Sequence, residues 1–248
     1  MKAVILAGGQ GVRLRPLTYY FQKCMIPIGT KQKPLLEYII RLLKHHSLKD
    51  ILILAGYKHQ QIQNYFEDGS RLNVKITYVI DRPDYKGTAL ALLNALEQGH
   101  LKPNEDILVY YGDILSNINL TNLIQTHLEK KAIATLALAT GYRIRVGTAK
   151  TAPDGRITQL IEKPQLSTPV TIGILALNTT ALQEVKQLKK HLKQVDIMAH
   201  LIPQLIKQGK PVYSYITAEY WQDIGSTERY EKLDHNQIDN LLAHLLKD

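Results

Sequence analysis

Residues 1–18 read MKAVILAGGQGVRLRPLT, and this stretch decides the fold. It begins with a short apolar run, Lys2–Ala7, of the kind that forms a buried β-strand. Three glycines follow directly, Gly8, Gly9 and Gly11. Glycines after a strand let the backbone approach a ligand closely and point N–H groups into a concave, anion-attracting surface. The stretch therefore predicts a buried first strand with an anionic ligand at its end.

Outward from this strand, short apolar runs alternate with amphipathic stretches. The expected strands are Lys2–Ala7, Asp50–Ala55, Val74–Val79 and Asp106–Tyr110. The expected helices are Leu35–His45, Lys58–Phe66, Thr88–Gln98 and Leu120–Glu129. Strand–helix repetition requires crossover connections between parallel strands. The pattern predicts the α/β class, with a doubly wound, mostly parallel, Rossmann-like sheet that has helices on both faces.

From about Ala132 the rhythm changes to closely spaced strands. These are Ala134–Thr140, Val146–Lys150, Ile157–Glu162 and Thr171–Leu177, with a Pro-Asp-Gly hairpin turn at residues 152–155. Helices over Thr180–Lys190 and Val195–Gln208, a strand over Pro211–Ile216 and one long final helix from about Thr227 to Leu246 follow. Because no linker or repeat interrupts the chain, we expect a single domain over 1–248 whose C-terminal third adds antiparallel strands to the same core.

Composition narrows the classes of function. The 248 residues contain 31 Lys and Arg against 22 Asp and Glu, a formal charge of +9 that suggests polyanionic partners. The single cysteine, Cys24, excludes an intramolecular disulfide and any cysteine-based zinc or iron–sulfur site. The N-terminal apolar run is too short for a signal peptide, and no stretch is long enough to span a bilayer. We therefore expect a cytoplasmic protein without a membrane partner.

The basic residues of the glycine-rich loop point to a triphosphate. The loop lacks the Gly-Lys-Ser/Thr ending of a Walker A motif, and Leu14 stands where the Rossmann fingerprint has its third glycine. Arg13 and Arg15 lie within the loop, and Lys23 follows a few residues later. Clustered cations of this kind stabilise phosphoryl or nucleotidyl transfer. The alternative is a structural turn whose basic residues are merely solvated.

Several motifs in a fixed order resemble those of one family. LAGG at 6–9 and KPLLEY at 33–38 are followed by KGTA at 86–89, YGD at 111–113, IEKP at 161–164, IG at 172–173 and WQDIG at 221–225. The chain resembles the sugar-phosphate nucleotidylyltransferases, which include glucose-1-phosphate thymidylyltransferases and mannose-1-phosphate guanylyltransferases. The resemblance implies a nucleotide-binding part over about 1–130, and a sugar-phosphate-binding part with a C-terminal helix over about 131–248.

The resemblance also implies a reaction and its catalytic residues. A sugar-1-phosphate oxygen attacks the α-phosphorus of a nucleoside triphosphate, which releases pyrophosphate and forms a nucleotide sugar. Asp113 and Asp223 are expected to hold Mg²⁺, a hard cation that takes carboxylate and phosphate oxygens. Arg13 is expected at the β- and γ-phosphates, Lys23 near the α-phosphate and Lys163 at the sugar phosphate. Asp113 follows a strand and so also lies at the sheet edge where α/β proteins bind ligands.

Further residues are expected to bind the two substrates. The nucleotide is expected to contact Leu6, Ala7, Gly8, Gly9, Gly11, Arg82, Gly87 and Thr88. The sugar phosphate is expected to contact Gly147, Glu162, Lys163, Gly173 and Trp221. The two glycines of the second set could instead mark ordinary strand bulges, and Glu162 with Lys163 could be a surface charge pair.

Departures from the family pattern leave the substrates open. Val12 stands in place of a hydroxyl residue, Gln22 in place of a proline, and Arg82 at a position often held by a base-reading Gln. The base, from dTTP, UTP, GTP or CTP, and the sugar both stay open. The alternatives are a different phosphorylated acceptor, such as a phosphocholine-like one, or a catalytically silent nucleotide-sugar-binding homologue.

The expected partners are small phosphates. They are a nucleoside triphosphate and a sugar 1-phosphate, and nucleic acid is not expected because no basic block with interleaved aromatics occurs. The oligomeric state stays open, a homodimer included.

Overall fold

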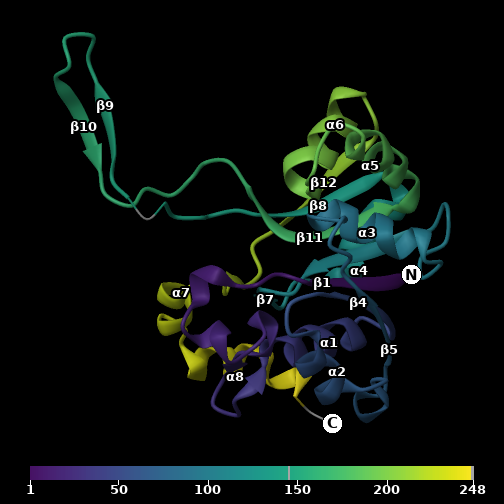
Figure 1. Ribbon diagram of the computed structural model, residues 1–248. Helices are drawn as coiled ribbons and strands as arrows, with labels where there is room; N and C mark the ends of the chain where they lie inside the picture. Colours follow the sequence, from purple (N-terminus) through teal and green to yellow (C-terminus); the bar gives the residue numbers. More distant parts are fainter. Residues whose placement is uncertain (145, 247–248) are drawn as a thin grey trace.

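The computed structural model describes residues 1–144 and 146–246 and is built around one seven-stranded sheet (Figure 1). The strand order is β12-β8-β11-β6-β1-β4-β5. The strands are β1 Lys2–Ala7, β4 Asp50–Ala55, β5 Lys75–Ile80, β6 Asp106–Tyr111, β8 Ala134–Ala139, β11 Val170–Asn178 and β12 Val212–Thr217. The predicted α/β class is confirmed.

The sheet is mostly parallel, as predicted. β6, β1, β4 and β5 run parallel to one another, and β12 runs parallel to β8. β11 is antiparallel to both of its neighbours, β6 and β8. The chain leaves β1 toward β4 on one side and later returns to β6 on the other. This reversal of strand order at β1 creates a crevice at the carboxyl ends of the strands, where ligands bind in open α/β sheets.

Alternating side chains of β1 pack into two separate hydrophobic cores, one on each face of the sheet. Ala3, Ile5 and Ala7 pack with α1 and α2 on one face, whereas Val4 packs with α3 and α5 on the other. The helices are α1 Leu35–His45, α2 His59–Phe66, α3 Thr88–Glu97, α4 Leu120–Glu129, α5 Leu182–Lys189 and α6 Ile202–Lys207. Both faces of the sheet are therefore covered, and the central strands read as continuous apolar runs for that reason.

The predicted hairpin forms, but it does not join the main sheet. β9 Thr148–Thr151 and β10 Ile157–Ile161 pair only with each other, and all their residues are exposed. The pair projects far from the rest of the molecule (Figure 1). The expectation that every strand of the C-terminal third extends the same core is wrong for these two, because neither has a covered apolar face.

The prediction of a single long final helix is also wrong. The chain forms α7 Thr227–Glu231 and α8 His235–Leu242, and a 3₁₀ turn over Ala243–Leu245 ends it. Asp234 breaks the helix because its side chain accepts a hydrogen bond of 2.9 Å from the backbone N–H of Gln237 and so caps a new helix. No helix in the described part of the chain is long and apolar enough to cross a membrane.

Candidate active site

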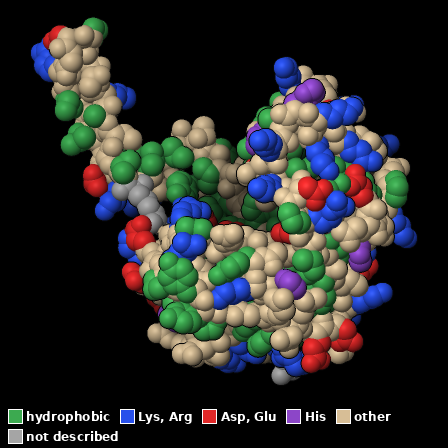
Figure 2. Space-filling view, viewed as in Figure 1, with side chains coloured by type: hydrophobic (Ala, Val, Ile, Leu, Met, Phe, Trp, Pro, Cys, Tyr) green, Lys and Arg blue, Asp and Glu red, His purple; other side chains and the backbone are tan. Residues whose placement is uncertain are grey.

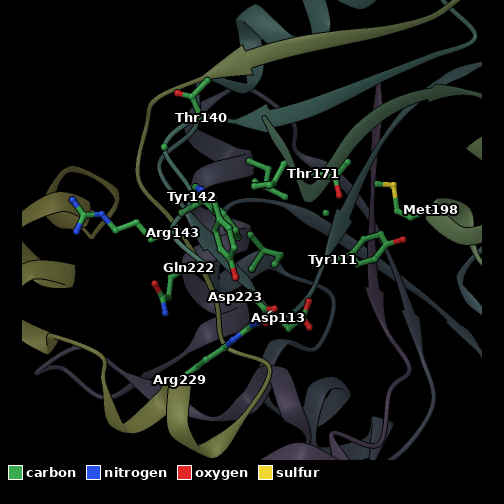
Figure 3. Close-up of a pocket in the computed structure, with 16 residues that line it drawn as sticks. Tyr111, Asp113, Thr140, Tyr142, Arg143, Thr171, Met198, Gln222, Asp223 and Arg229 are labelled. Atoms are coloured by element: carbon green, nitrogen blue, oxygen red, sulfur yellow. Dashed lines mark hydrogen bonds and ion pairs between the residues drawn. The ribbon is translucent and has the colours of Figure 1, made fainter. Parts of the chain in front are cut away.

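Two pockets of about 540 Å³ each lie at the carboxyl edge of the sheet. The first, which we call the strand-end pocket, is lined by residues that follow β1, β5 and β6 and by the start of α3. The second, the β13 pocket, lies beside strand β13 Trp221–Asp223 and is drawn in Figure 3. Tyr111 and Asp113 line both pockets. Ligands in the two pockets would therefore meet at the end of β6.

The glycine-rich loop is held against β1 by a buried glutamine. The Gln22 side-chain amide donates a hydrogen bond of 2.6 Å to the carbonyl of Ala7, and its oxygen accepts one of 2.6 Å from the backbone N–H of Cys24. Thr18 donates a hydrogen bond of 2.9 Å to the carbonyl of Gly11, which has a left-handed φ of 61°. These hydrogen bonds hold the loop in place although Gln22 stands where the family pattern has a proline.

The structure brings Asp113 and Asp223 together from distant parts of the chain. β13 pairs antiparallel with β7 Ile114–Ser116, and Asp223 is the register partner of Ile114. The backbone N–H of Ile224 also donates a hydrogen bond of 2.9 Å to the carbonyl of Asp113. Figure 3 shows the two carboxylates side by side at the floor of the β13 pocket.

Each carboxylate has a cation as its partner. Lys23 Nζ forms an ion pair with Asp113, and Arg229, in α7, forms one with Asp223. One oxygen of Asp223, Oδ1, is buried and has no hydrogen-bond partner among the described residues. A buried carboxylate oxygen without a partner is costly, and a cation or a donor from a ligand would satisfy it.

The donor set suits a hard divalent cation that is shared with a phosphate. Among residues 1–144 and 146–246, no group of three or more His, Cys, Asp and Glu side chains could enclose a metal. Two adjacent carboxylates with one unsatisfied oxygen leave most coordination positions to phosphate oxygens and water, which is how Mg²⁺ is usually held.

Arg13 approaches the same carboxylates from the glycine-rich loop. A Cβ added at Gly225 would lie 3.3 Å from Arg13 Nη2 and would overlap Asp223 Oδ1. The absence of a side chain at Gly225 therefore lets the loop, Asp223 and the guanidinium come together. Three cations of the site, Arg13, Lys23 and Arg229, thus gather around two carboxylates.

The start of α3 forms one wall of the strand-end pocket. Gly87 has a φ of 100°, and a Cβ there would lie 2.5 Å from the carbonyl oxygen of Val195. The Asp196 carboxylate accepts a hydrogen bond of 3.0 Å from the backbone N–H of Thr88 and so caps the helix. The Thr88 hydroxyl accepts one of 2.9 Å from the backbone N–H of Ile197. Both Gly87 and Thr88, which are expected at the nucleotide from the sequence, line the pocket.

The β13 pocket combines an aromatic stack with a close backbone approach. The rings of Tyr142 and Trp221 stack with centroids 6.0 Å apart and planes 25° from parallel. Gly173 lies at an irregularity of β11 with a φ of 72°, and a Cβ there would lie 3.2 Å from Cβ of Tyr111. Gly173 therefore both lies in a bulge of β11 and forms part of the pocket wall.

Comparison with known proteins fits this geometry. A sequence model of the nucleotidyl transferase family matches residues 2–240. The chain belongs to this family. A UTP–glucose-1-phosphate uridylyltransferase from Synechocystis is 33% identical over 93% of the chain, which spans 61% of that relative's length.

Two further proteins resemble this chain over nearly its whole length and nearly the whole of their own. A D-glycero-alpha-D-manno-heptose 1-phosphate guanylyltransferase from Aneurinibacillus thermoaerophilus is 31% identical over 94% of this chain and 96% of its own. A solved protein of Bacillus anthracis, assigned as a glucose-1-phosphate thymidylyltransferase, superposes with a TM-score of 0.75 at 23% identity and covers 98% of this chain and 95% of its own. The last comparison supports the fold.

Most of the predicted nucleotide contacts line the strand-end pocket. They are Leu6, Ala7, Gly8, Gly9, Arg82, Gly87 and Thr88, with Lys23 and Asp113 beside them. Gly11 is set back behind the loop, where a Cβ would lie 3.2 Å from Cβ of Lys23. The Arg82 side chain is exposed and forms an ion pair of 3.0 Å with Asp84.

The predicted sugar-phosphate contacts are divided. Gly173 and Trp221 line the β13 pocket. Gly147, Glu162 and Lys163 line neither pocket and lie at the stem of the projecting hairpin. Glu162 and Lys163 lie 3.9 Å apart with 72% and 64% of their side chains exposed, which is the geometry of a surface charge pair.

Sequence patterns alone missed three side chains of the site. Arg229 lies in an amphipathic stretch, and its contact with Asp223 depends on the placement of α7 beside β13, which no local pattern predicts. Tyr111 lines both pockets, and burial raises its pKa to about 12, so it stays a neutral donor. Asp81, the first residue after β5, lines the strand-end pocket, and burial raises the pKa of its carboxyl to about 6.

Proposed function

We propose that the protein transfers a nucleoside monophosphate from a nucleoside triphosphate to a sugar 1-phosphate and releases pyrophosphate. The observation that carries the proposal is the shared wall between the two pockets. A nucleotide over the glycine-rich loop and a sugar phosphate beside Trp221 would meet at Asp113 and Tyr111, which line both pockets. Holding two reactants in contact supplies a large part of the rate of a two-substrate transfer.

The named relatives support the same proposal. The Synechocystis and Aneurinibacillus proteins carry names of enzymes that join a nucleotide to a sugar 1-phosphate. The two names differ in the nucleotide and in the sugar, so they support the reaction class and leave the substrates open. The product would be a nucleotide sugar.

The residues of the site suit an in-line displacement. An oxygen of the sugar phosphate is already anionic, so it can attack the α-phosphorus without a general base. A new oxygen–phosphorus bond forms, and the bond between the α-phosphorus and the bridging oxygen breaks as pyrophosphate leaves with its electron pair. Lys23 and Arg13 would stabilise the charge that spreads over the phosphate oxygens, and Arg229 would hold Asp223 in place.

Magnesium is part of the proposal. Asp113 and the unpartnered Oδ1 of Asp223 would hold the ion, which when bound neutralises phosphate charge and orients the triphosphate. In the absence of substrates, Lys23 and Arg229 neutralise the same two carboxylates and keep them positioned.

The proposal is tested by measuring pyrophosphate release with each of five triphosphates, ATP, GTP, CTP, UTP and dTTP, against a panel of sugar 1-phosphates. We expect release with at least one pair, its loss with a chelator, and a reduction of about 1,000-fold or more in Lys23→Ala. Lys31→Ala, an exposed basic residue nearby in sequence, is the matched control and should keep full activity. Nucleotide-sugar binding without release from any pair would instead identify a silent binding homologue.

A further inference from the structure

Asp81 places an unpartnered carboxylate inside the strand-end pocket. It is half-buried just after β5 and packs against Gly56, which follows the neighbouring strand β4, and against Gly8, which follows β1. A Cβ added at Gly56 would lie 2.6 Å from Asp81 Oδ2, and one added at Gly8 would overlap the same oxygen. Two missing side chains thus make room for this carboxylate.

No protein group satisfies the Asp81 carboxylate. Within residues 1–144 and 146–246, no hydrogen bond or ion pair reaches it, and only its backbone N–H is bonded, to the carbonyl of Ala55 at 2.8 Å. The neighbouring cation, Arg82, is paired with Asp84 and lies over the ring of Tyr85. Burial alone raises the pKa of Asp81 to about 6, so the group is mostly ionised at neutral pH and lacks a donor. A half-buried acceptor without a donor is costly for the free protein.

The strand order places Asp81 at the base end of a bound nucleotide. Asp113 follows β6, and β1 and β4 separate β6 from β5. Three strand spacings put the backbone of Asp81 about 14 Å from that of Asp113 along the sheet edge, and the Asp81 carboxylate reaches back over Gly56 as far as Gly8, which follows β1. The phosphates belong with Lys23 and Asp113 under the proposed function, on which this inference rests. An extended nucleotide then reaches Asp81 with its base, between Leu54 and Tyr85 of the same pocket.

We propose that Asp81 reads the base and selects guanine. An ionised carboxylate only accepts hydrogen bonds. The Watson–Crick edge of guanine offers two neighbouring donors, N1–H and the exocyclic N2 amine, which one carboxylate can accept together. Uracil and thymine flank their single N–H with two carbonyls, and adenine and cytosine place a ring acceptor beside their amine. Each of these bases would turn an acceptor toward the carboxylate, and sites built for a donor reject such analogues strongly.

The test is equilibrium binding of nucleotides by calorimetry in the presence of magnesium and without an acceptor. We expect GTP to bind at least about tenfold more tightly than inosine triphosphate, which lacks only the N2 amine, and about 100-fold more tightly than ATP, CTP, UTP or dTTP. This comparison uses the unaltered protein, so it does not depend on the folding of any variant. Equal binding of UTP or dTTP and GTP would overturn the assignment.

A variant separates base reading from other roles of the carboxylate. In Asp81→Asn, GTP should bind about tenfold to 100-fold more weakly, and the difference between GTP and inosine triphosphate should shrink. The melting temperature at neutral pH should not fall, because the variant removes a half-buried charge. Asp84→Asn, on the same loop but outside the pocket, is the matched control and should keep the GTP preference.

The outcomes keep this inference apart from the proposed function. If Asp81 bound the ribose hydroxyls instead, Asp81→Asn would weaken all triphosphates equally, and that result would overturn base reading. Selective GTP binding without pyrophosphate release would contradict the proposed reaction while base reading stood. Pyrophosphate release with UTP at the rate for GTP would contradict base reading, while the proposed reaction stood.

Discussion

At the scale of single residues, Gly173 lines the β13 pocket and packs against Tyr111, which lines both pockets. Its φ of 72° strains any residue with a Cβ, and that Cβ would press on Tyr111 at 3.2 Å and Ile114 at 3.3 Å. We expect Gly173→Ala to lower stability by about 1–3 kcal/mol and to raise the KM for the sugar phosphate more than that for the nucleotide. Denaturant unfolding and steady-state kinetics measure the two effects.

Gly155 is the matched control for this prediction. It has a similar φ of 85°, but a Cβ there would meet no atom, because it lies in the exposed hairpin turn. Gly155→Ala should therefore show the backbone strain without the kinetic change. Equal kinetics in Gly173→Ala and the unaltered protein would remove Gly173 from the pocket wall.

Glu37 illustrates a residue-scale effect that depends on pH. Its buried carboxylate accepts hydrogen bonds of 2.8 Å from Lys33, 3.0 Å from Arg41 and 2.8 Å from Tyr65, and Arg71 lies 3.7 Å away. Burial alone would raise its pKa, but these partners lower it below the ordinary 4.5. A lowered pKa in the folded state adds stability above the unfolded-state pKa, and this stability is lost as the pH falls through the folded value.

We therefore expect Glu37→Gln to lower the free energy of unfolding by about 3 kcal/mol at neutral pH. The difference from the unaltered protein should shrink as the pH falls from 4.5 through the lowered folded-state pKa, below which both side chains are neutral. Urea unfolding at several pH values measures this. Glu129→Gln, an exposed control, should change stability by less than about 0.5 kcal/mol at every pH. A pH-independent difference for Glu37→Gln would show that packing rather than charge is responsible.

The sequence predicted some residues of the site and missed others for physical reasons. Asp113 could be predicted because it follows a strand of continuous apolar residues, and this strand end fixes its place at the sheet edge. Asp81 was missed because the strand before it was expected to end at Val79, whereas β5 continues to Ile80. One further residue of strand puts Asp81 at the edge. Arg82 was chosen instead, but its guanidinium turns to Asp84, a local contact that no periodicity reveals.

At the scale of elements, the hairpin of β9 and β10 is independent of the core. Its apolar side chains are exposed, with Val146 and Ile157 at 64% and Leu160 at 70%, and Figure 2 shows hydrophobic side chains along the projection. Sequence alternation predicted the strands and their turn, because both are local. The direction of the hairpin depends on the stem, where the N–H of Leu166 donates to the carbonyl of Tyr142 at 2.8 Å. The N–H of Ile144 also donates to the carbonyl of Pro164 at 3.0 Å, and crossing contacts of this kind have no sequence signature.

We expect the hairpin to contribute almost nothing to the stability of the body. A variant that replaces residues 148–161 with a short glycine linker should keep its melting temperature within about 2 °C, because β9 and β10 pair only with each other. Differential scanning calorimetry measures this.

Two leucines supply the matched pair for the hairpin prediction. Leu160→Ala, on the hairpin, should change the free energy of unfolding by less than about 0.5 kcal/mol. Leu177→Ala, fully buried in β11, should cost about 2–5 kcal/mol. A large loss of stability on hairpin removal would mean that the hairpin packs on the body in solution.

At the scale of the whole molecule, the charge surplus divides into two parts. Arg13, Lys23 and Arg229 gather at the two carboxylates and account for a small part of the net +9. On the face drawn in Figure 2, other Lys and Arg side chains lie spread over the surface with Asp and Glu among them. A spread of this kind gives general solubility, whereas concentrated charge gives phosphate binding. The fold therefore concentrates three cations, Arg13, Lys23 and Arg229, at the sheet edge.

The metal is expected to serve the substrates rather than the fold. No group of three or more potential ligands occurs among residues 1–144 and 146–246, so these residues offer no site where a metal alone would hold the fold together. A chelator should therefore leave the melting temperature of the free protein unchanged. A nucleotide at 100 times its Kd stabilises a folded protein by about 2.7 kcal/mol, which for a domain of this size is a rise of about 5–10 °C.

That rise should require magnesium and an intact Asp223. Because phosphate oxygens and the two carboxylates share the ion, chelation or Asp223→Asn should remove most of the nucleotide-induced shift, while Asp154→Asn on the hairpin should not. Thermal melts with and without nucleotide, metal and chelator measure all these terms in one experiment. If the chelator lowered the melting temperature of the free protein, the metal would be structural. If the nucleotide shift survived chelation in full, Lys23 and Arg13 alone would hold the phosphates, and the two-carboxylate site would not bind the ion.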